Sequence, residues 1–135
     1  MTIICYCDGA ARPNPGKGGI GIAIRSKDDK WHYDISESCA KSRITNNEAE
    51  YLAVERALIE LIRNKLTSEE IIMHSDSEML VSQLSDSNKK VIGGSYVYVY
   101  NRVKKELLPK FSNIKFEWFY RENNAEANLL ASKAL

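Results

Sequence analysis

Hydrophobic and polar positions along the first third of the chain follow a strand pattern. Residues 2–7 are apolar and β-prone, and residues 20–24 and 31–36 predict two further strands joined by a polar turn. The segment between the first two strands is rich in Gly and Pro and is typical of a turn. Three successive strands with short links favour an antiparallel meander.

The rest of the chain alternates between helical and strand patterns. The helix predicted from residue 46 to about residue 65 has no Gly or Pro, carries an apolar stripe and begins with the capping-box pair Thr45 and Glu48. A strand, two helices, a strand and a helix follow at residues 71–73, 77–84, 96–108, 114–120 and 124–135, with a polar loop at 85–95. This order, βββ-α-β-α-α-β-α, predicts an α/β fold in which helices flank a mixed five-stranded sheet.

Composition narrows the class of protein. The chain has 135 residues, which predicts a single domain over 1–135, and no apolar run is long enough to span a bilayer. Three cysteines, an odd number, and no secretion signal predict free thiols in a reducing compartment, and therefore a cytoplasmic protein. The formal net charge is only +1, so nucleic-acid binding would depend on basic residues gathered locally.

Three carboxylates interrupt the hydrophobic pattern. Asp8 and Asp76 each follow an apolar run, at strand ends where sites gather in sheets with parallel strands. Glu50 lies on the apolar stripe of the long helix, where a charge is costly unless it is paired or binds a cation. Each acid alone has a structural alternative: a turn, a helix cap or an ion pair. Together they would repel one another without divalent cations, and oxygen ligands suit Mg²⁺ or Mn²⁺.

Four short motifs surround these acids and follow one another along the chain. They read YCDGA at 6–10 with NPG at 14–16 and GGIG at 18–21, RITNNEAEYLA at 43–53, SDS at 75–77, and RENNAEANLLA at 121–131. In this order the set resembles type 1 ribonucleases H, in their short form without a basic protrusion. The resemblance implies a ribonuclease H-like fold. It also implies two-metal hydrolysis of the RNA strand of RNA–DNA hybrids, leaving a 3′-hydroxyl and a 5′-phosphate.

The resemblance assigns catalytic roles residue by residue. Asp8, Glu50 and Asp76 fall on the family's metal-binding acids, which implies two Mg²⁺ ions per site, with Mn²⁺ as a substitute. The family's fourth acid position holds Asn128, whose neutral amide has one good metal-ligating atom. Natural or engineered, this Asn predicts impaired activity, and Glu122 in the preceding loop is a candidate stand-in.

Substrate-binding residues are carried over in the same way. Asn14, Asn46 and Asn47 match positions that touch the minor groove of the hybrid, where amides can bind a 2′-hydroxyl. Arg43 and Thr45 match a pocket for a DNA-strand phosphate, and their alternatives are a surface charge and a plain helix cap.

One arginine and two lysines complete the candidates. Arg121 stands where some short relatives have an Arg in place of a loop histidine, so it is a further catalytic candidate, with a strand-end surface Arg as the alternative. Lys89 and Lys90, in the 85–95 loop, replace the extra basic helix of some relatives and predict either phosphate contacts or a solvated face.

The expected partner is an RNA–DNA hybrid, with double-stranded RNA left open, and the chain is expected to be a monomer that does not bind membranes. The rival function is a non-catalytic module of the same fold that binds hybrid or double-stranded RNA. Asn128 is the best argument for this rival.

Overall fold

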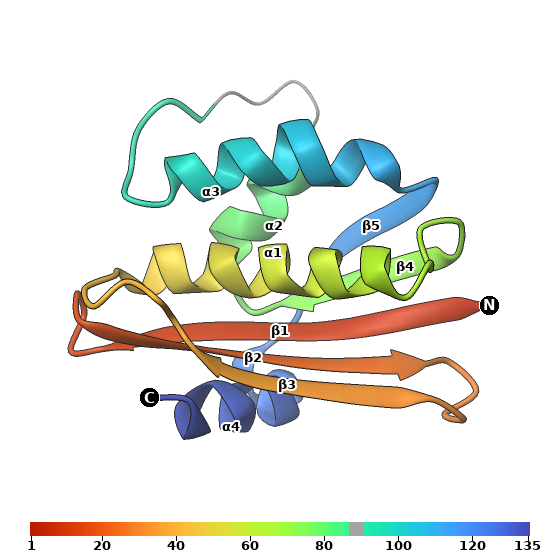
Figure 1. The fold of residues 1–135 in the computed structure, drawn as a ribbon, viewed down its shortest axis with the longest axis horizontal. Helices are drawn as coiled ribbons and strands as arrows, with labels where there is room; N and C mark the ends of the chain where they lie inside the picture. Colours follow the sequence, from red (N-terminus) through yellow and green to blue (C-terminus); the bar gives the residue numbers. More distant parts are fainter. Residues whose placement is uncertain (87–90) are drawn as a thin grey trace.

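A mixed five-stranded sheet forms the centre of the molecule (Figure 1). The structure is a computed structural model, and it describes residues 1–86 and 91–135. The strands lie in the order β3-β2-β1-β4-β5; the first three are antiparallel, and β4 and β5 run parallel to β1. They are β1 (Thr2–Arg12), β2 (Lys17–Ser26), β3 (His32–Ser38), β4 (Glu70–Ser75) and β5 (Asn113–Trp118).

Helices cover both faces of this sheet, with α1, α2 and α3 on one face and α4 on the other (Figure 1). The chain order is βββ-α-β-α-α-β-α, as the sequence predicts. The helical segments are α1 (Asn46–Arg63), α2 (Glu78–Ser85), α3 (Val97–Arg102) with its continuations η1 (Val103–Leu107) and η2 (Leu108–Lys110), η3 (Arg121–Asn124) and α4 (Ala125–Lys133). The predicted meander and mixed sheet are therefore confirmed.

The first strand is longer than the strand predicted at 2–7. β1 continues to Arg12 because β2 pairs with it as far as the pair Arg12 and Lys17. The glycine-rich stretch thus forms backbone hydrogen bonds between two strands and not a local turn. The interpretation that Asp8 ends this strand was therefore wrong. The parallel ladder with β4 nevertheless ends at Tyr6 opposite His74, so Asp8 lies just beyond the parallel part of the sheet.

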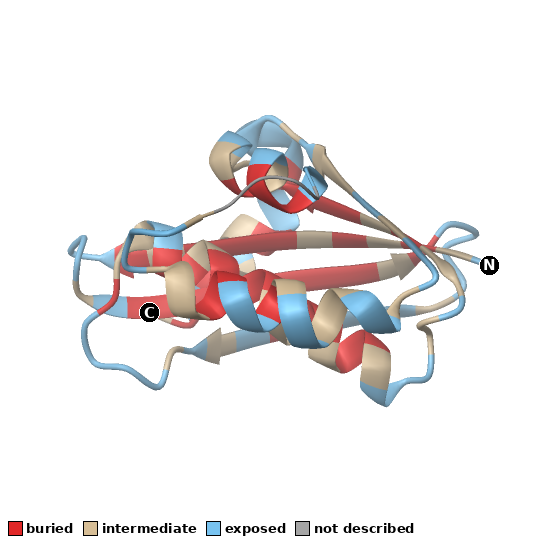
Figure 2. Cartoon of the chain, turned by 90° about the horizontal axis from the view of Figure 1, so that it is seen from above, coloured by how far each residue is buried: buried red, intermediate tan, exposed pale blue. Residues whose placement is uncertain are grey.

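The hydrophobic core lies between the sheet and the helices α1, α2 and α3 on one of its faces (Figure 2). The predicted apolar stripe of α1 is buried there: Ala53, Val54, Ala57, Leu58 and Leu61. From β1, Cys5 and Cys7 face this helix as small core residues, and all three cysteines are free. The capping box of α1 is also confirmed, since the Thr45 hydroxyl accepts from the Glu48 amide and the Glu48 side chain accepts from the Thr45 amide.

Two further predictions concern membrane-spanning segments and the lysines at positions 89 and 90. Within residues 1–86 and 91–135, no helix has the length and apolar character needed to cross a membrane. Lys89 and Lys90, predicted to contact phosphates or solvent, lie outside the described residues.

Candidate active site

Three acids from separate elements line one small hollow at the end of the parallel strands. Asp8 and Asp76 each lie two positions beyond the last β1–β4 pair, Tyr6 opposite His74. They are therefore neighbours across the two strands and point to the same face of the sheet. The hollow measures about 170 Å³ and is lined by Asp8, Gly9, Ala10, Ala11, Arg12, Asn46, Glu50, Asp76 and Arg121. The structure thus brings together the three acids that the sequence singled out.

The third acid reaches this hollow because α1 lies unusually close to β1. A Cβ atom placed on Gly9 would lie 2.2 Å from the carbonyl oxygen of Ala49, a distance that real contacts do not reach. Glycine is therefore required here for the helix to approach the strand. Glu50, the residue after Ala49, is thereby set against the end of the sheet beside Asp8.

The three carboxyl groups disfavour one another's charge. Burial, and then the neighbouring charge of Asp76, raises the pKa of Asp8 to about 7. Burial also raises the pKa of Glu50 to about 7; a hydrogen bond from Ser77 opposes that rise, and the charges of Asp76 and Asp8 add to it. The pKa of Asp76 is raised by burial as well, and the positive charge of Arg121 opposes the rise at all three acids. The hollow holds more negative charge than its protein surroundings neutralise.

Another acid on the same helix shows the opposite behaviour. Glu48 is only 2% exposed, yet its carboxylate is bound by Lys41 Nζ at 2.8 Å, by the Tyr98 hydroxyl and by the Thr45 amide at 3.3 Å. Burial alone would raise its pKa, but these bonds together lower it. Glu48 is therefore a structural acid, and its two-residue offset turns it away from the hollow.

The donor chemistry of the hollow fits a divalent cation, because carboxylate oxygens in excess of positive charge are what such ions bind. No three Asp, Glu, His or Cys side chains in the described part of the chain are arranged to hold one ion between them. Mg²⁺ commonly takes one or two protein carboxylates and completes its coordination with water and phosphate oxygens. Asp8, Glu50 and Asp76 are the residues here that would hold such ions.

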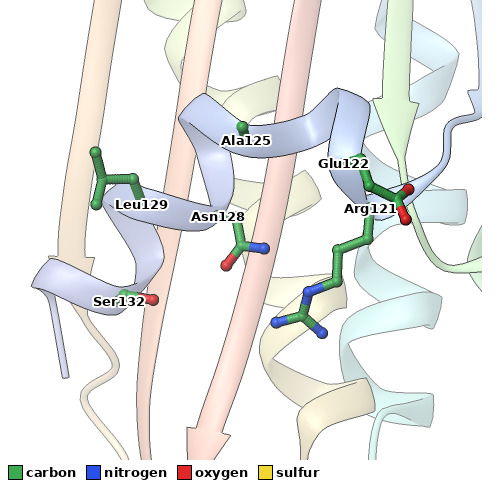
Figure 3. Close-up of a pocket in the computed structure, with 6 residues that line it drawn as sticks. All are labelled: Arg121, Glu122, Ala125, Asn128, Leu129 and Ser132. Carbon is green, nitrogen blue, oxygen red and sulfur yellow. The ribbon is translucent and has the colours of Figure 1, made fainter.

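Asn128, the fourth predicted site residue, lies next to this hollow and does not line it. It belongs to a more open hollow of about 410 Å³, lined by Arg121, Glu122, Ala125, Asn128, Leu129 and Ser132. Arg121 borders both hollows, and its side chain extends to the same side as that of Asn128, whereas Glu122 turns away (Figure 3). Glu122 lines only the Asn128 hollow, so its position gives no support to its role as a stand-in acid.

Two of the residues carried over for substrate binding, Asn14 and Asn46, are joined by a hydrogen bond. Asn14 Oδ1 accepts from the Asn46 amide at 3.0 Å, and Asn46 Oδ1 accepts from the Ala11 amide at 2.8 Å. Asn46 lines the acid hollow, and with its oxygen engaged its Nδ2 group is the part able to donate to a ligand. Asn47 is exposed on the first turn of α1.

The two residues expected at a phosphate pocket differ in their surroundings. Arg43 is exposed. The Thr45 hydroxyl, besides capping α1, lies 2.6 Å from the hydroxyl of Ser95, which precedes α3. Sequence reasoning did not include Ser95, because a serine in a polar loop gives no signal of its own.

Arg12 and Ser77 were also missed. Arg12 lines the acid hollow and donates to Ser132 of α4 at 3.1 Å, and Ser77 donates to Glu50. An arginine next to a proline-rich turn is typical of a surface charge, and Ser77 is at the same time the N-cap of α2. Neither pattern could have indicated a place beside the acids.

Comparison with known sequences finds a family and several relatives. A family model described as "Reverse transcriptase-like" matches residues 6–134. The ribonuclease H of Geotalea uraniireducens is 31% identical over 137 residues, covering 95% of this chain and 87% of that protein. The bifunctional protein Rv2228c of Mycobacterium tuberculosis is 31% identical over 140 residues. The match covers all of this chain but only 36% of that relative.

Comparison with solved structures agrees. The N-terminal RNase H domain of Rv2228c, solved as a fusion with maltose binding protein, gives a TM-score of 0.85 at 29% identity, covering 99% of this chain and 98% of that one. LC11-RNase H1, solved in complex with an RNA/DNA hybrid, gives a TM-score of 0.83 at 34% identity, covering 98% of this chain and 95% of that one. The fold predicted from the sequence is confirmed by these likenesses.

Proposed function

This chain belongs to the ribonuclease H members of the reverse transcriptase-like family, and we propose that it hydrolyses the RNA strand of RNA–DNA hybrids as a metal-dependent endonuclease. The observation that carries the proposal is the convergence of Asp8, Glu50 and Asp76 on one hollow that Asn46 also lines. A buried set of acids with raised pKa values is costly to the fold, and such sets cluster at functional sites. The hybrid in the LC11-RNase H1 structure supports the choice of substrate.

In the proposed mechanism, each residue of the hollow has a distinct task. Asp8, Glu50 and Asp76 are the residues that would hold divalent cations, and such ions would supply an activated water and stabilise the leaving oxygen. Asn46 donates through Nδ2 to the substrate, where a 2′-hydroxyl distinguishes RNA from DNA. Arg121 offers a cation to the phosphate of the reacting strand. A water oxygen attacks phosphorus and gives up a proton to solvent, the P–O3′ bond breaks, and the leaving 3′ oxygen takes up a proton from solvent, which gives a 3′-hydroxyl and a 5′-phosphate.

We further propose that Asn128 impairs this reaction. Two divalent cations bring four positive charges, and Asp8, Glu50 and Asp76 return three negative ones. An amide adds no charge and ligates through a single oxygen. The chain should therefore bind one of the two ions weakly and react slowly.

The decisive experiment is cleavage of a labelled hybrid by the chain, with Mg²⁺ and with Mn²⁺, beside single-stranded RNA, double-stranded RNA and double-stranded DNA. Metal-dependent cleavage of the hybrid RNA strand is expected, and the Asp8→Asn variant should show none. The proposal fails if neither the chain nor its Asn128→Asp form cuts hybrid with either metal.

The alternative is a binding module without catalysis, and Asn128 is the observation that favours it. Tight binding of hybrid or double-stranded RNA without cleavage, in both the chain and its Asn128→Asp form, would support this alternative. A monomeric state, a single domain over residues 1–135 and a cytoplasmic location remain predictions from the sequence.

A further inference from the structure

Two exposed aromatic side chains stand together at the end of β5, next to residues that line the acid hollow. Trp118, the last residue of β5, is 38% exposed, and Tyr120 is 62% exposed. Their rings meet edge to face, with centroids 4.6 Å apart. We call this contact the Trp118–Tyr120 pair.

The pair is tied to two residues that line the hollow. The Trp118 indole Nε1 donates a hydrogen bond of 3.2 Å to the backbone carbonyl of Asp76. Tyr120 directly precedes Arg121, and its own carbonyl accepts from the Asn123 amide at 2.9 Å, which closes the turn that carries Arg121. The Trp118 indole is therefore anchored to the backbone at Asp76, and the Tyr120 ring contacts it one residue before Arg121.

Neighbouring aromatic residues in the same segment behave differently. Phe119, between the two in sequence, lies on the opposite side and packs against His74 with ring centroids 3.9 Å apart. Phe119 thus covers part of the sheet, whereas the Trp118–Tyr120 pair leaves its rings open to solvent at the end of β5. Exposed rings that are adjacent mark a contact surface more often than scattered ones do.

A flat aromatic ring beside a cation suits one kind of ligand above others. Successive bases of a single strand stack on aromatic side chains, and Arg binds the phosphates between them. Paired bases inside a duplex have both faces covered by their neighbours, whereas an unpaired base leaves its faces free for such a ring. Asp76 and Arg121 also line the hollow where the reacting strand would lie, so the strand next to the pair would be the RNA strand.

We propose that the Trp118–Tyr120 pair binds an unpaired nucleotide of the RNA strand where that strand leaves the hybrid. The chain therefore prefers hybrids that carry a single-stranded RNA extension over blunt hybrids. This inference rests on the proposed hybrid-cleaving function and adds a substrate preference to it.

The test compares affinities for two hybrids of equal length, one blunt and one with RNA extensions of several nucleotides at its 5′ or 3′ end. All measurements use the full chain with Asp8→Asn, in Mg²⁺, so that the RNA stays intact. The extended hybrid should bind about tenfold more tightly, as expected for one stacked base. Tyr120→Ala should reduce that ratio toward one, and Tyr120→Phe should retain it.

Two controls separate stacking from other effects. Tyr33→Ala removes a tyrosine that is 44% exposed on β3, and it should leave the ratio unchanged. The dependence of affinity on salt should be the same for Tyr120→Ala as for its parent, because salt dependence reports phosphate contacts and not stacking.

Three outcomes would count against the pair as a nucleotide site. Equal affinity of the parent for blunt and extended hybrids overturns it, and so does a ratio that survives in Tyr120→Ala. In both cases hybrid binding persists, so the proposed function stands. If the chain binds no hybrid and its active form cuts none, the proposed function falls and this inference falls with it.

Discussion

Glu48 and Glu50 lie two positions apart on α1 and have opposite electrostatic surroundings. Glu48 is almost completely buried, but a lysine, a tyrosine and a backbone amide bind its carboxylate and lower its pKa. Glu50 faces two other acids, and its pKa rises to about 7. Burial alone thus does not distinguish a structural acid from a functional one; the balance of partners does.

The difference also indicates what each acid does for the fold. The bonds of Glu48 tie the start of α1 to Tyr98 in α3 and to Lys41 before the helix, so its charge stabilises the folded chain. The raised pKa values of Asp8 and Glu50 indicate that the ionised form of these acids destabilises the folded chain. Such strain is typical of functional sites.

The largest expected effect comes from adding a negative charge next to the acid hollow, at position 128. Asn128→Asp should raise Mg²⁺-dependent cleavage of hybrid RNA by orders of magnitude, because a fourth acid strengthens binding of the second cation. Initial rates at several Mg²⁺ concentrations measure this. Asn123→Asp adds the same charge five residues earlier on an exposed position and should change little. Equal rates for the chain and Asn128→Asp would show that this position is not a ligand.

Displacing α1 from β1 should disturb the acid hollow more than it disturbs the hydrogen bonds of Glu48. Gly9→Ala places a methyl group against the Ala49 carbonyl and should lower the free energy of unfolding by about 1–3 kcal/mol. Cleavage should fall further than stability alone explains, because Glu50 is displaced from Asp8. Gly93→Ala, which meets nothing within 4 Å, is the control. Denaturant unfolding with normal stability of Gly9→Ala would contradict the close approach.

Neutralising Glu48 and neutralising Glu50 should change the stability of the fold in opposite directions. In EDTA at pH 8, Glu48→Gln should lower the free energy of unfolding by about 1–2 kcal/mol, because charge-assisted hydrogen bonds to Lys41 and Tyr98 are lost. Glu50→Gln should raise the melting temperature, because an uncompensated charge is removed. Thermal unfolding of both variants measures this, and a loss of stability in both would remove the distinction between the acids.

The smallest expected effect is a pH dependence that depends on metal. The pKa values of Asp8 and Glu50 are raised to about 7 in the folded chain, so their protonated forms favour folding. That contribution is complete below about pH 4 and is lost as the pH rises through 7. In EDTA the melting temperature should therefore fall by a few degrees between pH 5 and pH 8, and Mg²⁺ should oppose the fall. In the double variant Asp8→Asn, Glu50→Gln, Mg²⁺ should no longer change the pH dependence of the melting temperature. If Mg²⁺ still changes it, the ion acts at another site.

Much of the fold was predictable because each element carries its own pattern. The apolar stripe of α1 and its Thr45–Glu48 capping box predict where that helix begins and what it buries. The glycine-rich stretch led to a wrong prediction of where β1 ends. The backbone of this stretch is hydrogen-bonded between β1 and β2 and does not form a local turn. Pairing between strands is decided by tertiary structure, which glycine content alone does not reveal.

The site was predictable where an acid contradicts its surroundings in the sequence. Asp8, Glu50 and Asp76 follow or interrupt apolar patterns, and the structure brings all three to one hollow. Arg12 gave no comparable signal, because its place depends on the path of β1. That Asn128 lies in a neighbouring hollow with Arg121 could not be predicted either, since it depends on how η3 and α4 leave the sheet.

The position of Arg121 between the two hollows makes them energetically dependent on each other. Its charge favours the ionised form of the three acids, and the same guanidinium borders the space beside Asn128. An anion that engages Arg121 from the Asn128 side would weaken that support and increase the proton affinity of the acids. By thermodynamic linkage, protonating the acids would in turn strengthen the hold on that anion. A newly formed terminal phosphate would thus be retained longer in acidic solution than in alkaline solution.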